Sequence, residues 1–383
     1  MRSPQPTVAT AMAAAVAGAD ALREVLSAAG GGAGNTPPPI VCPGHTRPLA
    51  EVAFSPHTPD GYFLISGCLD GSPMLRDASS GDWIGTFAGH KGAVWSAQLC
   101  SEARLAATGS GDFSAKVWDA VTGACLATLE HKHIVKSVDF RGDRQCLATG
   151  GHEGLARVYD VEHGLGGSPL ASFSTKAGDG GGRPAAINKV CWTPGGAPLL
   201  VCGAADGRVL AFDARDASAA PVATLECRSK AGVLENVMDL ELTDGKLGPT
   251  LTVAAGDRVH LFDAADWGRV KRAPIDCPVH FREEGGASLR PDGRELVLGG
   301  GRHGGSRQGA LGVEKGATNV GDIGSDLTVF SVDVDSGAIT HERKGHCGPV
   351  RCLRYHPDGT RFATGSEDGT IRLWEDVAPP GAD

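Results

Sequence analysis

Short runs of alternating apolar and polar residues, separated by turns rich in Gly, Asp and Pro, recur through most of this 383-residue chain. The clearest set lies near the C-terminus, where runs at 350–355 and 362–366 flank a Pro-Asp-Gly turn at 357–359, and a third run ends at Trp374. Strict alternation over four to eight residues predicts a strand with one buried face. Asp-Gly pairs between such runs predict hairpins, so this stretch is expected to form three antiparallel strands.

The same order of runs and turns is repeated along the chain. The last unit starts with a Gly-His pair at His346 and ends with Trp374, which is typical of one blade of a WD40 propeller. Six units precede it, and the second, from His90 to Trp118, is nearly ideal. The aspartates that close the units are 42, 41, 53, 50, 70 and 43 residues apart: Asp77, Asp119, Asp160, Asp213, Asp263, Asp333 and Asp376. Three spacings match a blade period of about 40–45 residues, so we predict an all-β, seven-bladed WD40 β-propeller.

The propeller is expected to cover residues 40–377, and three segments depart from the repeat. Residues 1–39 form an Ala-, Gly- and Pro-rich leader whose composition cannot bury a core, so it is expected to be disordered or weakly helical. The Gly-rich, aperiodic stretch at about 299–325 accounts for the spacing of 70 residues and is expected to be a surface loop inserted in the sixth blade. A short tail covers 378–383.

The last unit has no outer strand of its own, because only a Pro-containing tail follows Trp374. The short apolar run Ile40-Val41-Cys42 precedes the first Gly-His pair and belongs to no other unit. We therefore expect this run to pair with the last blade, which would close the ring and remove an exposed strand edge.

Composition narrows the class of protein. A net charge of −9 and a pI near 5.8 argue against a nucleic-acid-binding surface that covers the whole chain. The 11 cysteines are scattered, without a CxxC pair, which favours reduced, mostly buried thiols in the cytosol or nucleus. The leader carries little positive charge, which argues against a transit peptide. No apolar run approaches the roughly 20 residues of a membrane span.

Polar residues recur at fixed spacing within the blades. The two complete sets, in blade seven and then in blade two, are His346, Thr364, Asp368 and Trp374, and His90, Thr108, Asp112 and Trp118. A hydroxyl, a His and an Asp suggest a hydrolase, but a catalytic set occurs once and this one repeats. A buried Asp needs donors, which the His, the hydroxyl and the indole supply, so we predict a structural network. Blade one has Arg76 in the Trp position and blade three has Glu153 and Tyr159, so weaker networks are expected there.

Other chemical motifs are few. The Gly-rich stretch 299–305 lacks the Gly-Lys-Ser/Thr ending of a phosphate-binding loop. His131 and His133 could ligate a metal, but no further ligands stand at zinc spacing, so a blade-start His followed by a polar loop is the preferred interpretation. An enzyme would need one unrepeated polar cluster in the central channel, and none is visible in the sequence. We predict no catalytic residues, cofactor, metal or small-molecule substrate.

Function is then expected on the faces of the ring. Alternate residues of a strand point the same way, and the fifth residue after each blade's His should point toward the narrow end of the ring. These residues are Trp95, Lys136 and Arg351. An indole flanked by two cations is typical of a hot spot for a protein partner. The alternative for Trp95 is simple packing between blades, since large aromatic side chains are mostly buried.

Five segments go well beyond general WD40 patterning: 61–66 (GYFLIS), 81–87 (GDWIGTF), 89–95 (GHKGAVW), 115–121 (AKVWDAV) and 131–136 (HKHIVK). They resemble the serine/threonine kinase receptor-associated proteins, a WD40 family also called Unr-interacting proteins. Blades one to three and seven match this family strongly, and blades four to six match weakly. The family has an acidic extension after the last blade, whereas this sequence stops at Asp383, so contacts through that extension are not expected.

The resemblance implies a non-catalytic adaptor, present in the cytoplasm and nucleus. It implies a role in the survival-of-motor-neuron complex with Gemin-type and Sm proteins, which assembles spliceosomal small nuclear RNAs with protein, so that RNA is bound indirectly. It also implies a second role with receptor serine/threonine kinases and Smad proteins. A competing resemblance is to the WD40 subunit of translation initiation factor three, which shares the GHxGAVW stretch, but 82–85 and 131–135 favour the first family. Direct RNA binding would need a basic face with exposed aromatics, for which three residues are too few.

Overall fold

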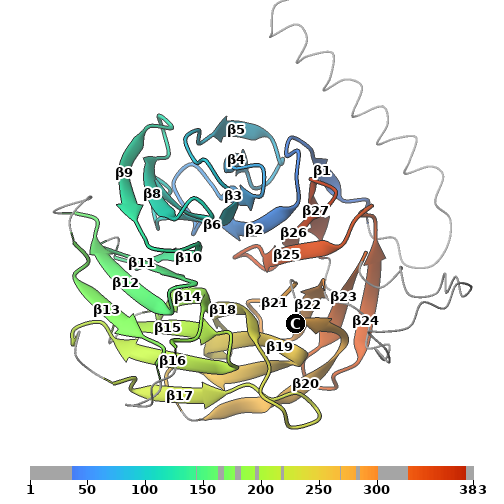
Figure 1. Cartoon of the computed structure of the whole chain (residues 1–383). Coiled ribbons are helices and arrows are strands. Elements are labelled where there is room, and N and C mark those ends of the chain that lie inside the picture. Colours follow the sequence, from blue (N-terminus) through green and yellow to red (C-terminus); the bar gives the residue numbers. More distant parts are fainter. Residues whose placement is uncertain are drawn as a thin grey trace, which may run out of the picture.

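Seven antiparallel sheets are arranged as the blades of a ring around a central channel (Figure 1). The computed structural model describes residues 37–376, except 144, 163–167, 177–182, 195–197, 217–219, 268, 282–284 and 301–326. Within these residues the secondary structure is all β, with 27 strands. The predicted seven-bladed propeller is confirmed. Most of the predicted leader, most of the inserted loop and the tail lie outside the described residues, and Gly299 still belongs to a strand.

Blades one to three each contain four strands, and the first strand of each blade lines the channel. Blade one consists of β2 (Leu49–Phe54), β3 (Phe63–Cys68), β4 (Met74–Asp77) and β5 (Trp83–Thr86). Blade two consists of β6 (Val94–Leu99), β7 (Leu105–Ser110), β8 (Ser114–Asp119) and β9 (Cys125–Glu130). Blade three consists of β10 (Val135–Phe140), β11 (Cys146–Gly151), β12 (Leu155–Asp160) and β13 (Ala171–Ser174).

Blades four to six, where the repeat is weakest, keep the same order with one exception. Blade four consists of β14 (Ile187–Trp192), β15 (Leu199–Ala204), β16 (Arg208–Asp213) and β17 (Ala223–Glu226). Blade five has three strands, β18 (Val237–Gly245), β19 (Gly248–Asp263) and β20 (Val270–Phe281). Blade six consists of β21 (Gly286–Leu289), β22 (Glu295–Gly299), β23 (Thr328–Asp333) and β24 (Ile339–Lys344).

Blade seven combines both ends of the propeller. It consists of β25 (Val350–Tyr355), β26 (Arg361–Ser366), β27 (Ile371–Glu375) and β1 (Ile40–Cys42). Strand β1 pairs antiparallel with β27 and places Ile40 opposite Leu373 (Figure 1). The predicted closure of the ring by residues 40–42 is therefore confirmed, and it satisfies the edge of β27 that would otherwise be exposed.

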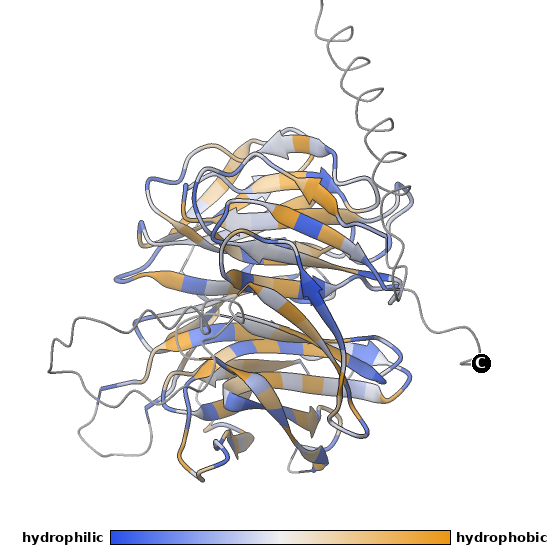
Figure 2. Ribbon diagram, turned by 90° about the vertical axis from the view of Figure 1, so that its right-hand side faces the viewer, coloured by the Kyte–Doolittle hydropathy of each residue, from blue (hydrophilic) through white to orange (hydrophobic). Residues whose placement is uncertain are grey.

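The hydrophobic core lies between the blades. Each sheet packs both of its faces against its neighbours, so its inner strands are buried on both sides, as in β11, where all six residues are buried. Figure 2 shows the apolar residues spread over the strands of all the sheets in view. One core cluster joins Ile65 and Leu75 of blade one to Ala97 and Trp118 of blade two. A recurring glycine in the second strand allows this close approach: a Cβ added at Gly150 would lie 2.7 Å from side-chain atoms of the next blade. No helix among the described residues is long and apolar enough to span a membrane.

Candidate interaction site at the mouth of the channel

The repeated polar set forms a linear chain of hydrogen bonds in blade two. His90 Nδ1 lies 2.8 Å from the Asp112 carboxylate, and His90 Nε2 lies 2.6 Å from Thr108 Oγ1. The indole N–H of Trp118 donates to the same hydroxyl at 2.9 Å. Burial lowers the pKa of His90, so we infer a neutral ring that donates to Asp112 and accepts from Thr108.

Blade seven repeats this chain with nearly the same distances. His346 lies 3.0 Å from Asp368 and 2.8 Å from Thr364, and Trp374 donates to Thr364 at 2.8 Å. Two details differ from the sequence prediction. The indole donates to the threonine and not to the aspartate, and the aspartate side chains are 12–13% exposed rather than fully buried. The aspartates receive backbone N–H groups instead, such as that of Cys347 at 2.9 Å.

Blades one and three hold altered versions of the set. In blade one, His45 still joins a carboxylate and a hydroxyl, while the guanidinium in the Trp position donates to the backbone carbonyl of Gly81 at 3.0 Å. In blade three, Glu153 pairs with Arg157, whose guanidinium also lies 2.8 Å from His131. The Nε2 atom of His131 has no hydrogen-bond partner in the structure, so the blade-three network is the less complete one.

Potential metal ligands come together at one place within the described residues, at His45, Cys68 and Asp70. Both ring nitrogens of His45 are already hydrogen-bonded, and burial raises the pKa of the Cys68 thiol to about 12. A protonated thiol and an occupied imidazole are poor ligands, so these residues fit a structural network better than a metal. His133 packs against Phe113 instead of joining His131.

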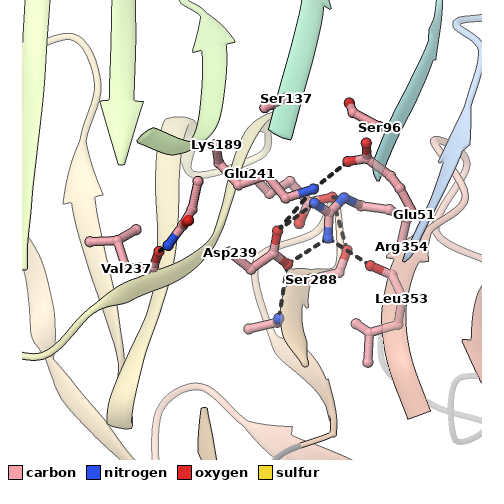
Figure 3. Close-up of polar contacts among 12 residues, drawn as sticks. Glu51, Ser96, Ser137, Lys189, Val237, Asp239, Glu241, Ser288, Leu353 and Arg354 are labelled. Carbon is pink, nitrogen blue, oxygen red and sulfur yellow. Dashed lines mark hydrogen bonds and ion pairs between the residues drawn. The ribbon is translucent and has the colours of Figure 1, made fainter. Parts of the chain in front are cut away.

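A cluster of charged residues that is not repeated from blade to blade lies inside the channel (Figure 3). Arg354 on β25 forms a bidentate ion pair with Asp239 on β18, with N–O distances of 2.6 and 2.7 Å. Lys189 on β14 binds Glu51 on β2 and lies 3.9 Å from Asp239. Glu241 on β18 accepts from Ser288 at 2.9 Å. The prediction that the channel holds no unrepeated polar cluster is therefore wrong, because four blades each contribute one or two of its charged residues.

The electrostatics of this cluster indicate that it stabilises the ring and does not catalyse a reaction. Burial would raise the pKa of Asp239, but the charges of Arg354 and Lys189 and the hydrogen bonds to this carboxylate together hold the pKa below its ordinary value. Burial raises the pKa of Glu241 to about 7, and also that of Asp139 on β10, which lines the same cavity as Glu51, Lys189 and Glu241. The ionised Asp239 carboxylate is neutralised by the Arg354 guanidinium, and the cluster offers no activated nucleophile.

The inner strands of neighbouring blades are also joined by hydrogen bonds between side chains and backbone. Neighbouring inner strands do not form ladders with each other, so their backbone N–H groups need side-chain acceptors. Ser96 accepts from Val138 at 3.1 Å, and Glu51 accepts from Ala97 at 3.2 Å. The remaining bonds of this kind run from Val190 to Ser137, from Trp192 to Asp139, from Ala287 to Asp239, from Leu289 to Glu241 and from Tyr355 to Ser288.

The three predicted partner-binding residues meet at one end of the channel, where the inner strands begin. The second residue of six inner strands falls at a β-bulge, where the pairing register with the next strand shifts. A bulge re-aims its side chain. All six of these residues line one cavity of about 180 Å³, which we call the channel mouth: Ala50, Trp95, Lys136, Asn188, Met238 and Arg351.

Within the mouth, Lys136 and Trp95 contact each other directly. The Lys136 ammonium lies 3.4 Å from the centre of the Trp95 ring, a cation–π contact. Arg351 forms an ion pair with Glu367 at 3.0 Å. Both Trp95 and Lys136 are half-buried. Their role in partner binding stays a prediction.

An aromatic group beside the mouth was not predicted. Phe113 is 43% exposed and packs on His133, which packs in turn on His152, a residue that lines the mouth. Phe113 has a φ of 67°, in the left-handed region that favours glycine. Blade seven has Gly369 at the matching position, with a φ of 76°. The sequence signal that could have revealed this group is Phe113 itself, which follows the blade's Asp at a position where blade seven has Gly.

Comparisons with known proteins agree with this geometry. The family model described as "WD domain, G-beta repeat" matches residues 81–119, 123–160 and 337–375. The serine-threonine kinase receptor-associated protein of Homo sapiens is 39% identical over 88% of this chain and 83% of its own length. The protein of that name from Dictyostelium discoideum is 34% identical over 88% of this chain and 98% of its own length.

More distant relatives carry a different name. Eukaryotic translation initiation factor 3 subunit I of Scheffersomyces stipitis is 28% identical over 88% of this chain and 92% of its own length. The closer group is of the scaffold type, and no catalytic family is indicated. The seven blades, the repeated polar chains and these identities together show that the chain belongs to the serine-threonine kinase receptor-associated protein family of WD40 β-propellers.

Proposed function

We propose that this protein is a non-catalytic scaffold in a complex of the survival-of-motor-neuron type, in the cytoplasm and nucleus. There it supports the loading of Sm proteins onto spliceosomal small nuclear RNAs, and thereby mRNA splicing. Its partners are Gemin-type and Sm proteins, and RNA is bound through them. The observation that carries this proposal is the 39% identity over 88% of the chain to a scaffold-type WD40 family.

The structure supports a scaffold rather than a catalyst. The hydroxyl–His–Asp chains occur in blades two and seven alike, and each threonine also receives an indole N–H. Such a threonine is held as a bridging group and is not free to attack a substrate. The charges in the channel are paired across four blades, which fixes a rigid ring whose faces can present partner-binding residues.

The test is affinity purification of the tagged full-length chain from its native cells, with mass spectrometry and RNA analysis. We expect Gemin and Sm proteins with small nuclear RNAs. Recovery of initiation-factor subunits with ribosomal RNA would replace this function with that of the translation-factor relative, at 28% identity the weaker match. Recovery of receptor serine/threonine kinases without Sm proteins would favour the receptor-associated role for which the relatives are named.

A further inference from the structure

The Lys136 ammonium stands out among the cations of the channel mouth. Lys189 is bound to Glu51, Arg354 to Asp239, and Arg351 to Glu367. Among the described residues Lys136 has a contact with the Trp95 ring and no carboxylate within ion-pair distance. A cation that is partly removed from water without a counter-charge is unfavourable, so the mouth is short of one negative charge.

The groups that face Lys136 come from every blade around it. They are Trp95 on β6, His152 in the turn after β11, Lys189 on β14, Arg351 on β25 and Glu51 on β2. Burial, together with the positive charges of Lys189 and Arg351, lowers the pKa of Lys136 to about 8, and the negative charge of Glu51 opposes this shift. A carboxylate placed between Lys136 and Arg351 would supply the missing charge.

The rim of the mouth adds an apolar surface. Phe113 keeps a conformation that costs a bulky residue roughly 1–2 kcal/mol and that glycine adopts freely in blade seven. Its ring is exposed rather than buried, so packing in the core does not compensate for this strain. Strain that persists without a gain in packing points to a function of the side chain. From Phe113, the rings of His133 and His152 form a continuous row to the mouth.

We propose that the channel mouth binds a short acidic and apolar segment of a protein partner. A glutamate or aspartate side chain enters the mouth and pairs with Lys136, and a neighbouring apolar side chain packs on Phe113 and His133. This inference rests on the scaffold function proposed above and specifies the chemistry of one partner contact.

A protein segment fits this surface better than RNA does. RNA phosphates need a continuous basic stripe, whereas here acidic groups stand among the basic ones: Glu367 pairs with Arg351, and Glu153, next to His152 in the chain, pairs with Arg157. A single unpaired ammonium at the end of a narrow cavity of about 180 Å³ matches one carboxylate on a short side chain. The aromatic row beside it matches an apolar neighbour in the same segment.

The first test compares two lysines. The probe is a fluorescent heptapeptide of alternating glutamate and leucine with uncharged ends, and its glutamine counterpart and a uridine octanucleotide serve as comparisons. Lys136→Met should weaken binding of the glutamate peptide at least about tenfold, since it removes a partly desolvated ion pair. Lys132→Met, which removes an exposed lysine at the same rim, should change the affinity less than about twofold. Binding should also weaken above pH 8, as Lys136 loses its proton.

The second test separates binding from folding. Phe113→Gly relieves the left-handed strain, so it should raise the melting temperature while it weakens peptide binding several-fold. Lys136→Met should likewise leave the melting temperature unchanged or raised. A residue with only a structural role would show the opposite, a lower melting temperature with unchanged affinity.

Four outcomes would overturn the inference: no binding of the glutamate peptide at millimolar concentration, equal binding of the glutamine peptide, equal losses in Lys136→Met and Lys132→Met, or preferred binding of the RNA. If any of these occurs while purification still recovers Gemin and Sm proteins, the scaffold function stands and only this contact is wrong. If purification recovers neither, the scaffold function itself fails.

Discussion

Two polar regions of this propeller look alike chemically but differ in how they are built. The chains around His90 and His346 each lie within one blade and occur twice with nearly the same distances. The channel cluster around Arg354 and Asp239 occurs once and joins four blades. The first holds the strands of a blade in place, and the second holds blades to one another.

This difference shows that the separation of contacting residues along the chain decides whether a polar set can be recognised from the sequence. His346 and Trp374 stand 28 positions apart, and their repetition in blade two exposes a shared structural role. Asp239 and Arg354 stand 115 positions apart, and each looks like an ordinary strand residue until the ring closes. A set that repeats within blades is therefore readable from one sequence, whereas a set assembled across blades is not.

The largest expected effect comes from breaking the channel cluster. Arg354→Met leaves Asp239 and Glu241 without their cation in a buried site, which should cost about 3–5 kcal/mol of unfolding free energy. Urea denaturation at pH 7 measures it. The matched control is Arg215→Met, which removes a largely exposed ion pair with Asp213 and should change the unfolding free energy far less. Equal losses in the two variants would mean that the channel cluster does not stabilise the ring.

Breaking the repeated chain should have the next largest effect. Asp112→Ala or Asp368→Ala removes the acceptor of a histidine and of backbone N–H groups, and should cost about 2–3 kcal/mol. Glu153→Ala in blade three, where the chain is already incomplete, should cost less. Thermal unfolding of the three variants checks this order. Unchanged melting temperatures for both aspartate variants would contradict a stabilising network.

The two regions should also respond to pH with opposite sign. The pKa of Asp112 is lowered to about 2 by its hydrogen bonds, so its stabilisation is present above pH 4 and is lost as the pH falls toward 2. Burial raises the pKa of Asp139 to about 7, so the folded state holds an extra proton and stability falls as the pH rises from about 4 to 7. Asp139→Asn keeps an oxygen that can accept the backbone N–H of Trp192. It should remove the contribution of Asp139 to the pH dependence of the unfolding free energy, which is up to about 1.4 kcal/mol per pH unit between pH 4 and 7.

Denaturation of wild type and Asp139→Asn at several pH values measures this slope. If the stability of the wild type rises between pH 4 and 7, and the variant shows the same pH dependence, then Asp139 is ionised throughout this range. Asp112→Asn serves as the control, because it should remove a pH dependence only below about pH 4, where the Asp112 carboxylate titrates, and should leave the slope between pH 4 and 7 unchanged.

The sequence was sufficient for the fold because its signals are local. Asp-Gly turns, alternating runs and the Ile40-Val41-Cys42 segment predicted seven blades and the closure by β1. It was sufficient for part of the site, because the fifth residue after each His marks the bulge that lines the mouth. It could not predict the pairing of Lys136 with Trp95, which depends on the angle between two blades, or the channel charges.

The central claim is that the repeated chains stabilise the fold while the channel mouth binds a partner. The most direct measurement compares Asp112→Ala with Trp95→Ala, and records for each the free energy of unfolding and the amount of partner recovered per folded molecule. We predict that Asp112→Ala loses stability and retains recovery, whereas Trp95→Ala loses recovery and less stability than Asp112→Ala. A Trp95→Ala variant that loses more stability than Asp112→Ala and keeps its partners would show that Trp95 belongs to the core, and would contradict the account.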